Sequence, residues 1–128
     1  MRRARVTGAS MALAVVALTA CGSQLPGPRT GPHVNDRAML VPYPPPPVRV
    51  DVVGPPPSNA KDLVWVDGQW SWSVSRWIWE KGYWVEQKPD EHYAPPVFYR
   101  NSNDDLVWFE GAFIDAKGDA VQKKTASK

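Results

Sequence analysis

Reactive and metal-binding side chains are scarce in this sequence. Its 128 residues include one cysteine, Cys21, and two histidines, His33 and His92. One cysteine cannot form an intramolecular disulfide, and neither histidine belongs to a cluster with metal-ligand spacing. Asp90 and Glu91 precede His92, but adjacent side chains point in different directions, so we interpret these three residues as a solvated loop. No serine has a histidine placed to activate it, and no glycine-rich phosphate loop is present. The sequence therefore predicts no catalytic residue, no metal and no cofactor.

The sequence also lacks an apolar run long enough for a permanent membrane helix. The apolar segment 11–18 is too short to span a bilayer, and it follows three arginines within the first five residues, as in a secretory signal. Residues 18–21 read Leu-Thr-Ala-Cys, which resembles the bacterial lipobox, in which the cysteine becomes the lipidated first residue. We predict a signal peptide over 1–20 and a lipid anchor at Cys21; a plain cleaved signal is the alternative. By the same resemblance, Gly22 in place of an aspartate implies an outer-membrane lipoprotein facing the periplasm, with exposure at the cell surface left open.

Net charge is small. The full chain carries a formal charge of +2 from 15 basic and 13 acidic residues. The signal holds three of the basic residues and none of the acidic ones, so the processed chain would have 12 basic and 13 acidic residues. Nucleic-acid binding depends on a strongly basic face. The composition therefore predicts no nucleic-acid partner.

Proline dominates the region before the aromatic residues. Prolines occur at positions 26, 28, 32 and 42, in the run 44–47 and in the run 55–57. Such a segment has no apolar periodicity and favours extended polyproline II. We predict a linker over 21–47, which at about 3.1 Å per residue reaches at most about 80 Å; a proline-rich ligand for a partner module is the alternative. The valine-rich stretch 48–53 is predicted to be the first strand of a folded domain over 48–114.

Aromatic residues are concentrated between positions 63 and 87. This stretch holds six of the seven tryptophans, and it contains the pattern W-x-x-G-x-W twice; a weaker third copy ends in Phe113. The tryptophans are Trp65, Trp70, Trp72, Trp77, Trp79, Trp84 and Trp108. They alternate with β-branched residues, which is typical of strands. A weaker block over 93–114 repeats the plan, so the sequence indicates an internal repeat.

Each copy of the pattern contains an x-Gly pair that interrupts a strand-like run. We predict hairpin turns at Gly68, Gly82 and Gly111, where glycine would supply a positive φ; a glycine bulge would shift the register by one residue. With a four-residue loop over 73–76, side-chain alternation places six tryptophans on one face of a four-stranded meander. The predicted fold is a small all-β antiparallel sheet of tandem hairpins, folded into a sandwich or partly closed barrel. Residues 115–128 are predicted to be a flexible polar tail.

These motifs resemble the bacterial YXWGXW-repeat (WxxGxW) proteins. The resemblance covers about residues 48–114 and includes the two W-x-x-G-x-W copies and the closing Tyr-x-Pro-Pro-x-Phe-Tyr-Arg at 93–100. The chain departs from the family pattern where Asp67, Lys81 and Glu110 replace proline before the glycine, and where Phe113 replaces tryptophan. The resemblance implies an exported or lipid-anchored location and a repeat architecture, and it implies no activity.

The tryptophans admit two roles. Aromatic pairs stabilise a small domain without disulfides, so the indoles can form its core. If part of their face stays open, indoles contact the apolar faces of sugar rings, which indicates peptidoglycan or another envelope polysaccharide as ligand. A protein interface would use the same residues, and tryptophan also favours the membrane surface. We therefore predict a non-catalytic structural or binding role in the envelope, with an interaction or assembly module for envelope proteins as the alternative.

Overall fold

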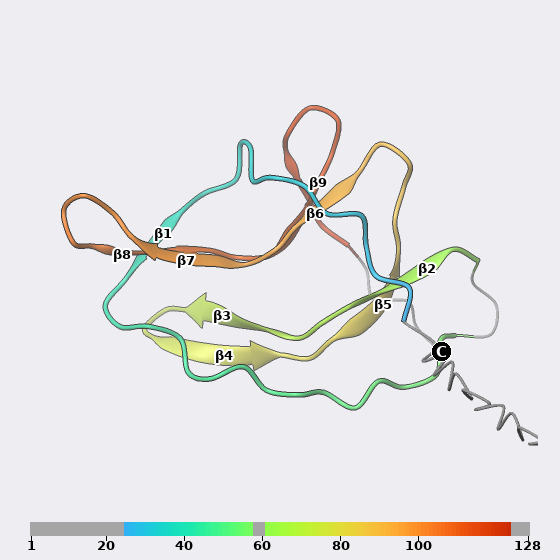
Figure 1. Ribbon diagram of the computed structural model, residues 1–128, viewed down its shortest axis with the longest axis horizontal. Coiled ribbons are helices and arrows are strands. Elements are labelled where there is room, and N and C mark those ends of the chain that lie inside the picture. The colour runs from blue at the N-terminus through green and yellow to red at the C-terminus, as the bar shows by residue number, and fades with distance from the viewer. Residues whose placement is uncertain (1–24, 58–60, 124–128) are drawn as a thin grey trace, which may run out of the picture.

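The computed structural model describes residues 25–57 and 61–123, and all regular secondary structure in these ranges is β-strand (Figure 1). The signal segment 1–20, Cys21 and the last residues of the tail lie outside the described residues. The strands are β1 (Met39–Val41), β2 (Leu63–Val66), β3 (Gln69–Ser73), β4 (Arg76–Glu80), β5 (Tyr83–Glu86), β6 (His92–Ala94), β7 (Val97–Arg100), β8 (Leu106–Phe109), β9 (Ala112–Ile114) and β10 (Ala120–Val121). The all-β prediction, with small antiparallel sheets, is confirmed.

The tryptophan-rich block forms one long two-stranded ribbon. β2 pairs with β5 and β3 pairs with β4, both antiparallel, and the residue numbers of every facing pair sum to 149. The two short sheets therefore share one register, interrupted where the x-Gly pairs of the two strands face each other. The chain reverses at Val74 and Ser75, not through the four-residue loop predicted over 73–76. We call this element the first ribbon.

The block that follows forms a second ribbon on the same plan. β6 pairs with β9 and β7 pairs with β8, and the residue numbers of every facing pair sum to 206. The interruption falls where Pro95 and Pro96 face Glu110 and Gly111. β1 adds a third strand beside β8, and β10 adds one beside β9. The predicted internal repeat is therefore two ribbons, each with a break in its middle.

The prediction of hairpin turns at Gly68, Gly82 and Gly111 is wrong. None of these glycines has a positive φ; in the described chain that conformation belongs to one glycine, Gly118 (φ 88°). What each glycine provides is space. A Cβ at Gly68 would lie 2.5 Å from the ring of Trp79, and a Cβ at Gly82 would lie 2.5 Å from the ring of Trp65.

The same close contact between an aromatic side chain and a glycine recurs in the second ribbon, where the Tyr93 hydroxyl lies against Gly111. In each case the ring against the glycine comes from the opposite strand. It belongs to the residue paired with the aromatic residue two positions after that glycine: Trp79 pairs with Trp70, Trp65 with Trp84, and Tyr93 with Phe113. Glycine is thus required because an aromatic ring of the opposite strand crosses over the backbone, which is a recognised use of glycine within strands. The four-stranded meander is consequently wrong as well.

The predicted linker and tail belong largely to the folded structure. Residues 25–35 run beside β2 and β6: Trp65 N donates to Pro26 O at 2.8 Å, and Gly31 N donates to Tyr93 O at 3.0 Å. β1 lies within the predicted linker, whereas residues 48–53, predicted to be the first strand, form no sheet pairing. β10 lies within the predicted tail, and Lys123 forms an ion pair with Glu91.

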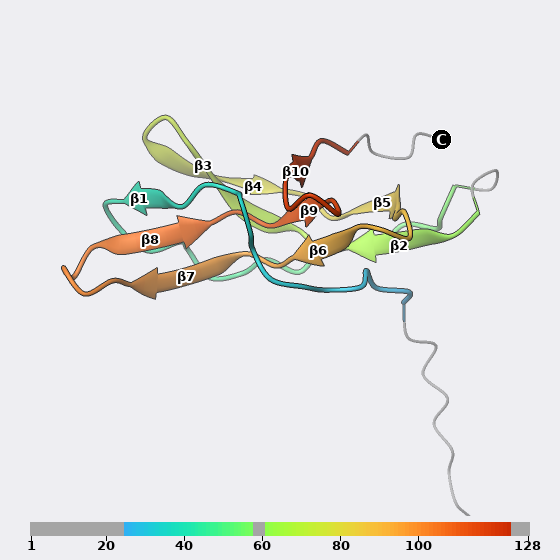
Figure 2. The same cartoon turned by 90° about the horizontal axis from the view of Figure 1, so that it is seen from above.

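The elements stack as layers. Figure 1 shows the second ribbon above the first, with the proline-rich segment along the opposite side of the first ribbon. Figure 2, from above, shows β1, β8 and β7 side by side. A cluster of buried side chains joins the two ribbons, formed by Val66, Val85, Tyr93 and Phe113. No sheet among the described strands closes into a barrel.

Candidate binding site

Three pairs of tryptophans face each other across the first ribbon, and we call them the tryptophan ladder. The pairs are Trp65–Trp84, Trp70–Trp79 and Trp72–Trp77, with ring centroids 5.5, 5.3 and 5.1 Å apart and edge-to-face geometry. Trp77 also meets Trp108 of the second ribbon at 5.1 Å. Such pairs stabilise a fold by about 0.5–1.5 kcal/mol each beyond their area burial.

Residues 43–54 lie along this ladder, and we call them the covering segment. It accepts hydrogen bonds from the indole N–H groups: Trp77 Nε1 donates to Tyr43 O (3.3 Å), Trp70 Nε1 to Pro47 O (3.2 Å) and Trp84 Nε1 to Gly54 O (2.9 Å). A proline-rich chain in extended conformation has carbonyls that form no internal hydrogen bonds, so it suits a row of indole donors. The covering segment thus satisfies these indoles within the chain itself.

Two charged side chains of the covering segment point toward the ladder. The Arg49 guanidinium lies 4.7 Å from the ring centroid of Trp70, as a cation–π contact. Asp51 accepts hydrogen bonds from Gly82 N at 2.6 Å and from Trp79 Nε1 at 3.0 Å. The Gly82 N–H and then the Trp79 indole lower the pKa of Asp51, because both stabilise its charged form. Asp51 therefore fixes the covering segment to the strand of the first ribbon that runs through β4 and β5.

The predicted binding or core aromatics consequently lie inside the fold. Trp65, Trp70, Trp84 and Trp108 are buried, and Trp72, Trp77 and Trp79 are half-buried beneath their neighbours. No open row of indoles remains along the ladder in the described part of the chain. The structure places the ladder as core.

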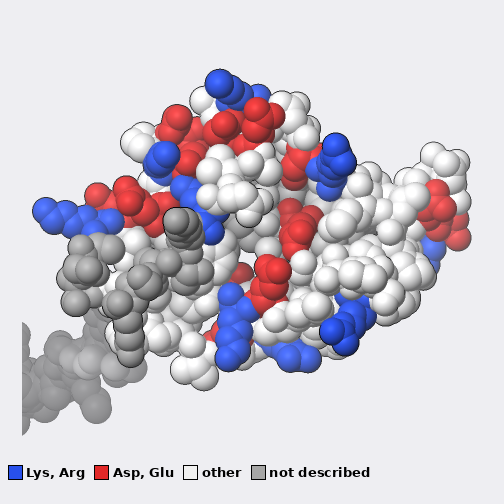
Figure 3. Space-filling view, turned by 180° about the vertical axis from the view of Figure 1, so that it is seen from behind, with Lys and Arg blue, Asp and Glu red and all other residues white. Residues whose placement is uncertain are grey.

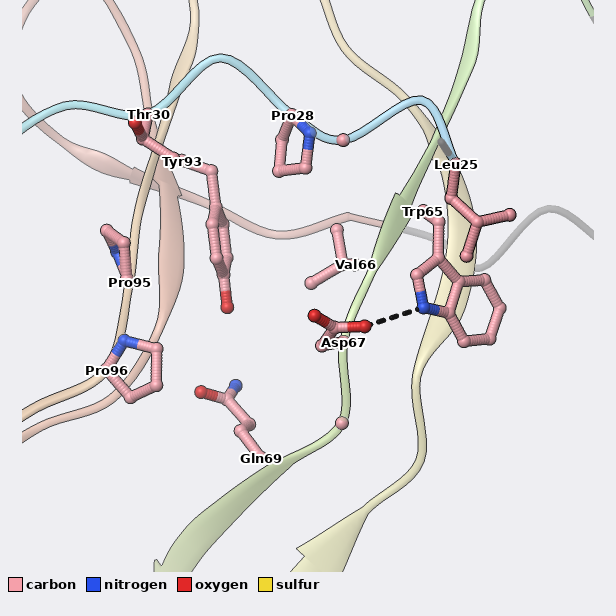
Figure 4. A pocket seen from close by; sticks show the side chains of 12 residues that line it. Leu25, Pro28, Thr30, Trp65, Val66, Asp67, Gln69, Tyr93, Pro95 and Pro96 are labelled. Atoms are coloured by element: carbon pink, nitrogen blue, oxygen red, sulfur yellow. Dashed lines mark hydrogen bonds between the residues drawn. The ribbon is translucent and has the colours of Figure 1, made fainter. Parts of the chain in front are cut away.

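A pocket opens beside the ladder, where the two ribbons and the N-terminal segment meet (Figure 4). Its volume is about 380 Å³. Its walls are mainly apolar, and its lining side chains include Leu25, Pro28, Thr30, Trp65, Val66, Asp67, Gln69, Tyr93, Pro95 and Pro96. Aromatic and proline walls with a few polar groups are typical of small-ligand sites.

Tyr93 provides an unpaired donor in this pocket. Its side chain is only 8% exposed, and its hydroxyl makes no hydrogen bond within the described residues. Burial raises the pKa of Tyr93, so the hydroxyl keeps its proton. Figure 4 shows this hydroxyl directed toward Asp67 and Gln69.

Asp67 provides an acceptor in the same pocket. One of its oxygens, Oδ1, accepts from Trp65 Nε1 at 2.9 Å, and the carboxylate is otherwise exposed. The Gln69 amide is already used: its Oε1 accepts from Gly111 N at 2.8 Å and its Nε2 donates to Gly111 O at 3.2 Å. The free polar groups of the pocket therefore include the Tyr93 hydroxyl and the outer edge of the Asp67 carboxylate.

A second, more polar hollow lies across β4 and β9. Three carboxylates and three cations line it: Asp36, Glu80 and Glu110, and Arg37, Lys81 and Lys123. Burial and then the neighbouring Glu110 raise the pKa of Glu80. On the face shown in Figure 3, acidic and basic side chains are mixed, and neither sign forms a broad patch.

Glu91 and the histidines have structural contacts. Glu91 was predicted in a solvated loop, but it is 5% exposed and paired with Lys123. Burial opposes ionisation, yet the Lys123 ammonium and other hydrogen bonds lower the pKa of Glu91 overall. His92 Nε2 lies 2.7 Å from Pro32 O, and His33 contacts Asp36 and Pro95 O. In residues 25–57 and 61–123, no three His, Cys, Asp or Glu side chains are grouped to hold a metal ion.

Sequence reasoning missed Tyr93 as a site residue. The signal was present: besides Trp72 and Trp77 at the turn, aromatic pairs five residues apart begin at positions 65, 79, 93 and 108, each 14 or 15 residues after the one before, so Tyr93 and Phe98 form a fourth copy of the motif without its glycine. Asp51 was missed because its role depends on a contact 31 positions away.

Comparison with protein-family models, with curated proteins and with solved structures finds no match to this chain. Within the described residues, no helix is long and apolar enough to cross a membrane.

Proposed function

We propose that this protein is a lipoprotein of the bacterial outer membrane with a non-catalytic binding role, and that its ligand is a saccharide of peptidoglycan or of another envelope polysaccharide. The anchor at Cys21 and the periplasmic location rest on the resemblance of residues 18–21 to a lipobox. Four aromatic pairs, which begin at positions 65, 79, 93 and 108, support the relation to YXWGXW-repeat proteins.

The unpaired Tyr93 hydroxyl in an aromatic and proline-lined pocket is the observation that supports saccharide binding. A sugar ring combines an apolar C–H face with hydroxyl groups. Trp65 and Pro96 offer apolar surface to the ring, the Tyr93 hydroxyl donates a hydrogen bond, and the Asp67 carboxylate accepts one. This location differs from the expectation of an open tryptophan face, because the covering segment occupies the ladder.

Binding of the full chain to purified sacculi tests this function. Tyr93→Phe removes the donor and keeps the ring, so binding should weaken about 2- to 10-fold, the value of one hydrogen bond. Tyr99→Phe is the matched control, because Tyr99 is exposed on β7 outside the pocket. Equal binding by wild type and Tyr93→Phe would count against the pocket.

An interaction or assembly module for envelope proteins is the second candidate. It is favoured by the use of the tryptophans as core and by the exposed apolar side chains Val97, Phe98 and Tyr99 on β7, whose outer edge is unpaired among the described strands. Parallel captures with sacculi and with saccharide-free envelope proteins separate the two. Retention only by proteins, insensitive to Tyr93→Phe, would favour this candidate.

A further inference from the structure

The middle of the covering segment is an extended strand without a backbone partner. Its attachments to the first ribbon use indole N–H groups and the Asp51 carboxylate, not a backbone ladder. Within the described residues, the backbone N–H groups of 48–53 make no hydrogen bond. Unpaired extended backbone of this kind is a template for pairing with another strand.

The side chains of this stretch alternate between the ladder and the solvent. Arg49 and Asp51 point toward the ladder, as described above. Val48, Val50 and Val52 point away and are 78, 97 and 95% exposed. Exposed apolar side chains of this kind gain lateral contacts when a second strand pairs alongside and places its own apolar side chains next to them.

Prolines set the limits of this stretch. The runs 44–47 and 55–57 on either side lack backbone N–H groups, so neither can extend a ladder. A partner strand can therefore pair only with the short sequence between them, which reads Val-Arg-Val-Asp-Val-Val at 48–53 and is followed by Gly54, whose carbonyl is already bonded to Trp84.

We propose that residues 48–53 pair with the same stretch of a second copy of this chain, antiparallel and centred on Val50. In this register Arg49 faces Asp51 of the second copy, and Val48 faces Val52. Opposite charges that face each other across two strands are stabilising, and like charges are destabilising. The arrangement is two-fold symmetric and closed, so it yields a dimer.

Neighbouring registers are disfavoured by the same charges. A shift of two residues in either direction places Arg49 opposite Arg49 or Asp51 opposite Asp51. A shift of one residue pairs side chains that belong to opposite faces. Parallel pairing in register also places like charges together. The register centred on Val50 is therefore selected by charge complementarity, independently of the proposed saccharide site.

Charge substitutions at the centre of the two-fold axis test this dimer. In Val50→Lys or Val50→Glu, like charges meet in the homodimer, so sedimentation of the full chain in mild detergent should show dimerisation weakened at least tenfold. An equimolar mixture of the two variants should dimerise again, because lysine then meets glutamate. The fold is expected to persist, since the Val50 side chain is almost fully exposed.

Val74→Lys is the matched control, because Val74 is 99% exposed at the tip of the first ribbon. It should dimerise like wild type. A wild-type chain that stays monomeric up to millimolar concentration would overturn the proposal, as would a Val50→Lys variant that dimerises like wild type. A mixture that stays monomeric would refute the register.

Cysteine crosslinking gives an independent readout. The register places Val50 opposite its own copy, so Val50→Cys should form a disulfide-linked dimer under mild oxidation. Val74→Cys should not, and wild type reports any background from Cys21. Equal crosslinking of Val50→Cys and Val74→Cys would contradict the proposed dimer.

Discussion

Gly82→Ala is the sharpest test of whether the packing of the tryptophan ladder requires glycine at this position. A Cβ at this position would lie 2.5 Å from Cζ2 of Trp65, 2.8 Å from Val66 O and 3.1 Å from Gly68 N. Two of these neighbours are backbone atoms, and Trp65 is held by its hydrogen bond to Asp67. None of the three can move freely, so the added methyl group forces a displacement of the strand.

The expected magnitude combines two opposing effects. Overpacking by a methyl group costs about 1–3 kcal/mol, whereas replacing glycine by alanine where φ allows it stabilises by about 0.4–1 kcal/mol. We therefore expect Gly82→Ala to lower the free energy of unfolding by about 1–2 kcal/mol. With a slope of about 1 kcal/mol per molar urea, the midpoint should fall by about 1–2 M. Urea unfolding followed by tryptophan fluorescence measures this shift.

Gly54→Ala is the control, because a Cβ there meets nothing within 4 Å. It should leave the midpoint unchanged or raise it slightly. Trp65→Phe removes the ring atom closest to the new methyl group, so Gly82→Ala should cost less in that background. If Gly82→Ala unfolds at the same urea concentration as Gly54→Ala, the proposed requirement for glycine beneath the Trp65 indole is refuted.

Three further predictions concern the turn at Val74 and Ser75, the joint that Gln69 and Gly111 form between the two ribbons, and the covering segment. Val74 has φ of 57°, a strained conformation for a β-branched residue. Val74→Asn should therefore raise the free energy of unfolding by about 0.5–1 kcal/mol, which thermal unfolding would show as a higher midpoint temperature. No change would show that the turn stores no strain. Gln69→Ala removes both hydrogen bonds to Gly111 and should cost about 1–3 kcal/mol in urea unfolding; Gln122→Ala, on an exposed residue, should be neutral, and equal effects would contradict the joint. The pKa of Asp51 is lowered from its usual value of 3.8, so its contribution to stability is present above about pH 4 and is lost as pH falls through the lower, folded-state value. Asp51→Asn should flatten the acid limb of the stability profile, and an unchanged profile would rule out this contribution.

The β character and the repeat were readable from the sequence because they depend on local chemistry. Alternating aromatic and β-branched residues favour strands, and the pattern W-x-x-G-x-W marks the repeat. The glycines were also recognised as special. Their role was misassigned, because an x-Gly pair between two strand-like runs fits a turn as well as a break in one long strand.

The pairing of the tryptophans could not be derived locally. A hairpin at Gly68 would pair Trp65 with Trp70, and the long ribbon pairs Trp65 with Trp84, so both registers bring indole against indole. The choice depends on the facing strand, which has an aromatic ring against the glycine, and on the covering segment, which accepts hydrogen bonds from the indole N–H groups. Neither contact is visible in a window of neighbouring residues.

The proline-rich region illustrates the same division. Its composition alone predicted an extended chain without a core of its own, and the segment is extended. Whether such a chain projects into solvent or lies on a domain is decided by partners elsewhere in the sequence. Here four indole N–H groups and one backbone N–H find acceptors on the covering segment, so it lies on the ladder. The sequence by itself determined strands, repeats and the concentration of tryptophans in one block. The tertiary structure decided which strands face each other, that the tryptophans form the core and where the open pocket lies, because those outcomes depend on contacts between distant residues.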